Sequence, residues 1–117
     1  MTEVADFNPP VEVLPRLIDG LPQYWGAFER ECIKDLLTAR VEVGVERYGK
    51  PLSTFNGRSA DQDAIEEALD LMLYLKQWEM ESGKAGPDER GFDVHLLVHS
   101  AGELVRDILD VRDRKYE

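Results

Sequence analysis

The segment from Asp61 to Gln77 constrains the fold most, because as a helix it would be apolar around nearly its whole circumference. At about 100° per residue, one narrow strip collects its polar side chains, namely Asp63, Glu66, Glu67, Asp70, Tyr74 and Gln77. The rest of the surface of this helix carries Ile65, Ala68, Leu69, Leu71, Met72, Leu73 and Leu75. Such a helix is expected inside a bundle, where acids are costly unless a cation pairs with them. The segment therefore predicts a bound metal ion.

Length and composition indicate one domain spanning residues 1–117. No apolar run approaches the ~18 residues that a membrane span requires, and the first residues lack the regions of a signal peptide. We therefore expect a soluble, cytoplasmic protein. The net charge of −10 argues against binding to nucleic-acid polymers or membranes, whereas small phosphorylated molecules can still bind through divalent cations.

Apolar spacing predicts an all-α bundle of three long helices behind an N-terminal arm, residues 1–21, that is extended or forms a short helix. The first long helix is predicted from about Pro22 to Tyr48, with Gly49 as its stop. The second follows a capping box of Ser59 and Gln62 and ends near Gly83. The third follows Pro87 and Asp88 and runs to about Arg112, and its apolar face, like those of the other helices, predicts assembly into an oligomer.

The connection between the first two long helices is longer than an antiparallel helix pair needs. Loops of this size in compact domains are often functional. This one carries Lys50, Asn56 and Arg58, so it is a candidate lid or substrate contact.

The first long helix carries a second polar strip, composed of Glu31, Asp35, Thr38, Glu42 and Glu46. If the first two helices pack antiparallel, Glu42 and Glu46 can face Glu67 and Asp70. Four carboxylates would then converge, and oxygen ligands of this kind suit Mg²⁺, with Mn²⁺ as a possible substitute. The alternative is that these acids are solvated or are paired with arginines, for which Arg40, Arg47 and Arg58 are the candidates.

Other metal chemistries fit the sequence less well. A di-iron bundle usually uses Glu-x-x-His, but His95 and His99 follow Phe92 and Leu96 at that spacing. The two histidines also lack the glutamate of H-E-x-x-H, so we interpret them as surface residues. The lone Cys32 excludes an internal disulfide and a cysteine-based zinc site, and is interpreted as a small buried residue.

A family resemblance rests on two motifs, ERYGKPLSTFNGR at Glu46 to Arg58 and EEALDLMLYLKQ at Glu66 to Gln77. Together they resemble the MazG-like members of the all-α nucleoside triphosphate pyrophosphohydrolase superfamily, particularly the short versions encoded by phages and actinobacteria. Glu67 and Asp70 match the second metal motif of that family, Glu-x-x-Asp. The first motif of the family is usually Glu-x-x-Glu, whereas this chain has three residues between Glu42 and Glu46.

The resemblance implies a dimeric or tetrameric helical enzyme, in the host cytoplasm if phage-encoded, that uses Mg²⁺ to hydrolyse a nucleoside triphosphate to the monophosphate and pyrophosphate. We assign Glu42, Glu46, Glu67 and Asp70 to the metal, and Glu66 or Asp63 to orienting or deprotonating the attacking water.

Substrate contacts are assigned to the loop and to one aromatic residue. Lys50 and Arg58 are candidates for the phosphates, with a solvated loop charge as the alternative. Asn56 can contact a base or sugar, although Asn before Gly57 is also an ordinary turn pair. Tyr74 can stack on a base, as can Trp25 and Trp78, and core packing is the alternative for all three.

A rival hypothesis from another class is a noncatalytic acidic helical oligomer that acts as a protein-interaction or regulatory module. In that case the apolar helix faces form the oligomer and the acids recruit a basic partner. Metal binding distinguishes this module from the enzyme.

Overall fold

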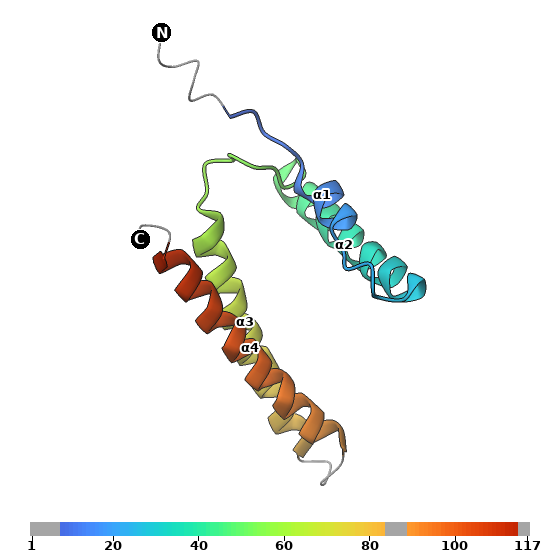
Figure 1. Ribbon diagram of the computed structural model, residues 1–117, viewed down its shortest axis with the longest axis vertical. Coiled ribbons are helices and arrows are strands. Elements are labelled where there is room, and N and C mark those ends of the chain that lie inside the picture. The colour runs from blue at the N-terminus through green and yellow to red at the C-terminus, as the bar shows by residue number, and fades with distance from the viewer. Residues whose placement is uncertain (1–7, 84–88, 115–117) are drawn as a thin grey trace. The chain divides into compact units, whose positions relative to one another are not determined.

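The computed structural model describes residues 8–83 and 89–114. This part of the chain contains four helices, α1 (Val13–Asp19), α2 (Ala27–Tyr48), α3 (Ala60–Gly83) and α4 (Glu89–Arg114) (Figure 1). Its only extended pairing is an isolated antiparallel bridge between Glu12 and Ser53. The all-α prediction, with three long helices and a short N-terminal one, is therefore confirmed. The chain divides into two units, Met1–Gly57 and Arg58–Glu117.

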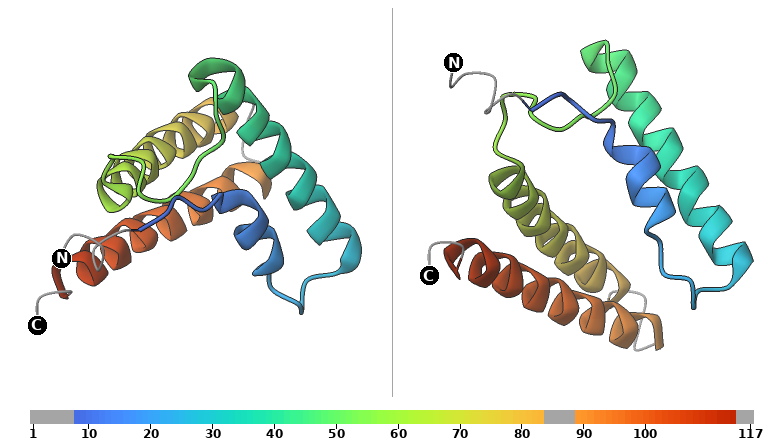
Figure 2. Two further views of the ribbon diagram at one scale, coloured as in Figure 1. Left: turned by 90° about the horizontal axis from the view of Figure 1, so that it is seen from above. Right: turned by 45° about the horizontal axis from the view of Figure 1, so that its top comes forward.

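In the second unit, α3 and α4 lie antiparallel and side by side along most of their lengths (Figure 2). Alternating spacings of three and four residues mark the contacting face of each helix, as in a coiled coil. The buried side chains are small or β-branched and lie at these spacings: Ile65, Ala68, Val94, Ala101 and Val105. Half-buried positions such as Met72, Leu75, Val98 and Ile108 continue the same two rows. The core of this unit is thus one seam between two helices.

The ends of α3 agree with the sequence, but its N-terminal capping does not. The helix begins at Ala60, and the Asp63 N–H donates to the Ser59 carbonyl at 3.0 Å. The predicted capping box of Ser59 and Gln62 is wrong, because the Ser59 hydroxyl donates to the Asp61 carboxylate. The side chain of Gln62 instead bonds to Glu66 and Arg112. Asp61 also accepts from the Gln62 N–H at 3.0 Å, so a first-turn aspartate takes the capping role.

In the first unit, α1 lies beside α2 (Figure 1). The predicted start of α2 at Pro22 is wrong by five residues. A turn precedes the helix, in which the Trp25 N–H donates to the Pro22 carbonyl at 3.3 Å, and Gly26 is extended with φ −61° and ψ 152°. Glycine disfavours the helix interior, so the helix begins only after it. The predicted stop at Gly49 is confirmed by its left-handed φ of 83°.

The N-terminal arm contains α1 and is tied to the loop that follows α2. The Val13 N–H donates to the Leu52 carbonyl at 3.0 Å, and the Thr54 N–H donates to the Val11 carbonyl at 2.9 Å. The Thr54 hydroxyl accepts from the Val11 N–H at 2.9 Å. These bonds fix the first half of the loop to the arm.

Burial of α3 is less complete than its sequence predicts. Only Ile65 and Ala68 of this helix are buried among the described residues, while Leu73 and Tyr74 are 69% and 67% exposed. The reason is that within its unit α3 has a single neighbouring helix, which covers one face. The interpretation of Cys32 as buried is also wrong, since it is exposed on α2, a helix with no buried residue.

Candidate functional site

The acidic strip of α3 lies on the side of the helix opposite the α4 seam. Asp70 follows the buried Ala68 by two residues and is turned from it by about 200°. Glu66, Glu67 and Asp70 are exposed and Asp63 is half-buried. Large apolar side chains that are 43–69% exposed flank the strip, with Leu69 and Leu73 on one side and Leu71 and Trp78 on the other. Carboxylates and apolar flanks therefore share one uncovered surface.

Two of the strip's acids have no protein partner. Within the described residues, neither Glu67 nor Asp70 forms a hydrogen bond or an ion pair. Glu66 accepts from the Gln62 amide at 3.2 Å. The two residues that match the second metal motif of the resembled family are thus the two left without a donor.

Asp63 and Arg58, both predicted site residues, bind each other. The Arg58 Nε and Nη2 atoms donate to the two Asp63 carboxylate oxygens, each at 2.9 Å. This hydrogen-bonded guanidinium lowers the pKa of Asp63 below its ordinary value and outweighs the opposing effect of desolvation. A carboxylate held ionised in this way is a weaker base, so Glu66 is better suited to accept a proton.

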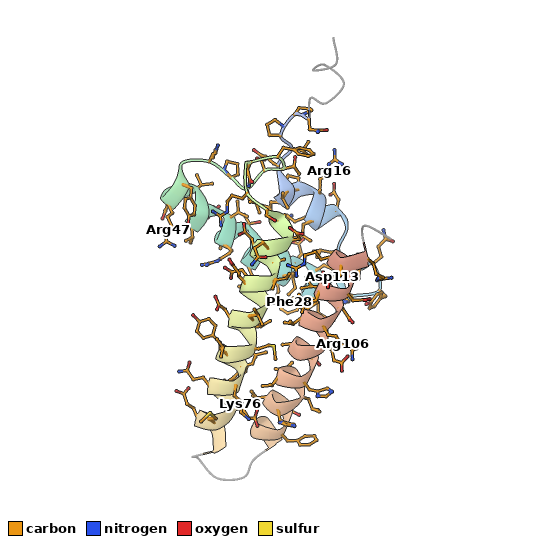
Figure 3. The ribbon with its side chains drawn as sticks, turned by 90° about the vertical axis from the view of Figure 1, so that its left-hand side faces the viewer. Arg16, Phe28, Arg47, Lys76, Arg106 and Asp113 are labelled. Atoms are coloured by element: carbon orange, nitrogen blue, oxygen red, sulfur yellow. The ribbon has the colours of Figure 1, made fainter. Side chains whose placement is uncertain are left out.

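On α2, Glu42 and Glu46 lie one turn apart and both are exposed. Neither forms an ion pair or hydrogen bond within the described residues. Arg47, in the last turn (Figure 3), instead lies over the Tyr48 ring, with its guanidinium carbon 5.8 Å from the ring centroid. The alternative to metal binding was that arginines pair with these acids. Within the described residues, Arg58 does so, with Asp63.

The predicted metal site remains a prediction. Among the described residues, no group of three or more histidine, cysteine, aspartate or glutamate side chains is placed to hold a metal ion. The α2 pair belongs to the first unit and the α3 pair to the second. Each unit therefore carries two neighbouring carboxylates.

The loop after α2 presents a cation and an unusual aromatic residue. Lys50 is exposed and has no partner in the described part of the chain. Asn56 precedes Gly57, whose φ of 85° fits the ordinary turn considered for this pair. Phe55 has a φ of 54°, which costs a bulky residue about 1–3 kcal/mol, and its side chain is 68% exposed. Sequence analysis missed Phe55; the only signal was its position before the Asn-Gly pair.

The aromatic candidates lie in two places. Tyr74, on the acidic strip of α3, is exposed, and so is Trp78, so neither residue packs in the core of its own unit. Trp25 is half-buried beside an open hollow of about 280 Å³ at the start of α2, whose other lining residues are Phe28, Glu29, Cys32 and Ile33. Tyr74 is the one that shares a helix face with the candidate metal ligands.

The histidines of α4 are exposed, which confirms their interpretation as surface residues. His95 Nδ1 lies 3.2 Å from a carboxylate oxygen of Glu79, and His99 Nε2 lies 3.7 Å from Glu103. Desolvation raises the pKa of Glu79, but hydrogen bonds from His95 and Lys76 lower it by more, so that the pKa falls below its ordinary value. These histidines lie against carboxylates of the helix hairpin.

None of the helices in the described residues has the length and apolar character to cross a membrane. Comparison of the chain with family profiles, with curated proteins and with solved structures finds no match. The functional assignment therefore depends on the residues themselves, on their spacing and on their surroundings in this structure.

Proposed function

We propose that this chain is a Mg²⁺-dependent hydrolase that cleaves a nucleoside or deoxynucleoside triphosphate to the monophosphate and pyrophosphate. The observation that carries this proposal is a set of four carboxylates on two long helices that have no partner within the described residues, namely Glu42, Glu46, Glu67 and Asp70. The sequence around them resembles the MazG-like pyrophosphohydrolases. An exposed carboxylate without an internal cation is available to an external one.

The donor chemistry fits the ion. Carboxylate oxygens are the ligands that Mg²⁺ prefers, Mn²⁺ accepts the same set, and each helix offers two of them one turn apart. When bound, the ion would neutralise the charge of the triphosphate and lower the pKa of a water molecule. The proposed metal ligands are Glu42 and Glu46 of α2, and Glu67 and Asp70 of α3.

Hydrolysis requires a water oxygen to bond to the α-phosphorus while the bond from that phosphorus to the pyrophosphate oxygen breaks. Glu66 is proposed to orient this water or take its proton, because it is exposed on the same strip and is not bound to a cation. Asp63 is the second candidate, and its ion pair with Arg58 makes it the weaker base.

Substrate contacts are proposed for the loop and for one aromatic side chain. Lys50 supplies positive charge to the phosphates. Arg58 is the second candidate, with two of its five N–H donors already bound to Asp63. Asn56 contacts the base or sugar, and Tyr74 stacks on the base from the acidic strip. The partners are thus a nucleotide and, through the exposed apolar flanks of α3, a second or further copies of this chain in a homodimer or homotetramer.

The test is to incubate the purified protein with canonical and modified nucleoside triphosphates and Mg²⁺, and to measure monophosphate and pyrophosphate. We expect turnover of at least one member of the panel, and its loss when a chelator removes the ion. A folded protein that turns over none of the panel, with Mn²⁺ as well as Mg²⁺, contradicts the proposal.

Single substitutions identify which carboxylates are required for turnover. Glu67→Gln should abolish turnover while circular dichroism shows unchanged helicity, because the amide keeps the shape of the side chain but loses its charge. Glu81→Gln is the matched control, since Glu81 is exposed on the same helix and accepts a hydrogen bond from the Gln77 amide at 3.2 Å. Separate Glu42→Gln and Glu46→Gln variants identify which α2 carboxylate is required. Full activity in Glu67→Gln would exclude Glu67 as a metal ligand.

The exposed apolar flanks of α3 also favour a second candidate function, a noncatalytic interaction module. Leu73 and Met80 are 69% and 62% exposed, and a surface of this kind commonly marks a protein interface. In that case the acids bind a basic partner. Calorimetry separates the two functions, because the enzyme should bind Mg²⁺ or Mn²⁺ in the absence of any partner and the module should not.

A further inference from the structure

Phe55 stands out from the rest of the described chain by its backbone. It is the only described residue other than glycine with a positive φ, which is 54°. Asparagine and glycine adopt this left-handed conformation readily, whereas a phenylalanine adopts it at a cost. No burial compensates, because the ring is 68% exposed. Strain at an exposed aromatic residue indicates that the ring serves an external ligand.

The chain is fixed immediately before Phe55. Thr54 exchanges two hydrogen bonds with Val11, both at 2.9 Å. The residue that precedes the strained one is therefore attached to the N-terminal arm, which lowers the entropy lost when the ring binds a ligand.

The occupant that the proposed function offers for this ring is a nucleobase. Thr54, Asn56 and Gly57, the neighbours of Phe55 in sequence, add no apolar side chain, while Val11 and Leu52 of the same unit are 39% and 58% exposed. A flat heteroaromatic base needs only the face of the ring, and stacking of this kind contributes to nucleotide binding with any base. Lys50, in the same loop, has no partner in the described residues and can bind phosphate.

We propose that Phe55 stacks on the nucleobase of the nucleoside triphosphate and is a substrate-binding residue of this protein. The inference rests on the proposed function, because it assumes that the ligand is a nucleotide. Since stacking holds the base alike in the ground state and in the transition state, it should affect KM and leave kcat unchanged.

The decisive variant is Phe55→Asn, because asparagine tolerates the left-handed backbone and removes only the ring. We expect KM for the nucleoside triphosphate to rise about tenfold or more, with kcat unchanged, as stacking energies imply. The melting temperature should stay the same or rise. Phe55→Tyr should retain the wild-type KM. Inorganic tripolyphosphate, which has no base, should bind both wild type and Phe55→Asn equally in calorimetry.

The outcomes separate this inference from the proposed function. A wild-type protein that hydrolyses a nucleoside triphosphate, combined with an unchanged KM in Phe55→Asn, overturns the inference and leaves the function intact. A wild-type protein that binds a nucleoside triphosphate in calorimetry without hydrolysing it, and loses that binding in Phe55→Asn, supports the inference and contradicts the function. A Phe55→Asn variant that unfolds, or that dissociates an oligomer in analytical ultracentrifugation, assigns the ring to packing and overturns the inference.

Discussion

Gly44, in the middle of α2, offers a quantitative test of whether another part of the protein packs against this side of the helix. An added Cβ atom at this position would meet no other part of the structure within 4 Å. Replacing glycine by alanine in a helix interior stabilises it by about 0.8–1 kcal/mol. Gly44→Ala should therefore raise the free energy of unfolding by this amount, and the melting temperature by about 4 °C.

The acidic strip of α2 does not interfere with this test. Gly44 follows Glu42 by two residues, so it is turned from that carboxylate by about 200°. A metal ion or a helix bound at the acidic strip would leave Gly44 untouched. The stabilisation is thus expected whether or not the metal site forms.

Gly102 in α4 provides the matched control. A Cβ atom there would lie 3.4 Å from the terminal methyl carbon of Met72, which is an ordinary contact with a flexible side chain. Gly102→Ala should also be stabilising. Both variants are measured by urea unfolding followed by circular dichroism, at several protein concentrations. A destabilising Gly44→Ala beside a stabilising Gly102→Ala would refute the reasoning, and would show that another helix packs against the back of α2.

Two further predictions concern the second unit. Val94 is 1% exposed in the α3–α4 seam, so Val94→Ala should lower the free energy of unfolding by about 2 kcal/mol, seen as a lower urea midpoint with an unchanged slope. Arg58→Met should raise the pKa of Asp63 in an NMR titration, whereas Arg106→Met, which breaks an exposed pair with Glu103, should not. Because the folded-state pKa of Asp63 is depressed, its contribution to stability is present above the unfolded value near 3.8 and is lost as the pH falls through the lower folded value. Below pH 4 wild type should therefore lose more stability than Arg58→Met, and equal acid sensitivity would contradict the pairing.

The helices could be predicted because their signals are local. Gly49 ends α2 through its left-handed backbone, and the apolar spacing of α3 gives its length. Which helix faces are buried could not be predicted. Apolar periodicity shows which face of a helix tends to be buried, but it does not show which element packs against that face. Leu73 and Tyr74 therefore look like core residues in the sequence and are exposed in the structure. The predicted start of α2 was too early because Pro22 is compatible with a first helical turn. Gly26 is unfavourable inside a helix, so α2 begins only after it.

The candidate site also has features that could be predicted from local spacing and features that could not. Spacing alone places Glu67 and Asp70 on one helix face, and the structure shows that face opposite the α4 seam. The pairing of Arg58 with Asp63 depends on the path of the loop before α3, which has no periodicity from which to predict it. Phe55 escaped notice for the same reason, since a single left-handed residue leaves no pattern in the sequence.

On the exposed side of α3, burial has opposite effects on the free energy of the acids and of the apolar side chains. Burying Leu73 or Met80 against another helix is favourable, but the same contact brings Glu67 and Asp70 out of water, which is costly without a cation. A second acidic helix adds repulsion to that cost. If another acidic helix, such as α2 or α3 of a second copy, packs against this side of α3, positive charge is required at the contact. A divalent ion supplies more positive charge in a small volume than a lysine does. The metal-bound oligomer that we propose would meet both demands, that of the exposed apolar flanks and that of the acids without a partner in the described residues.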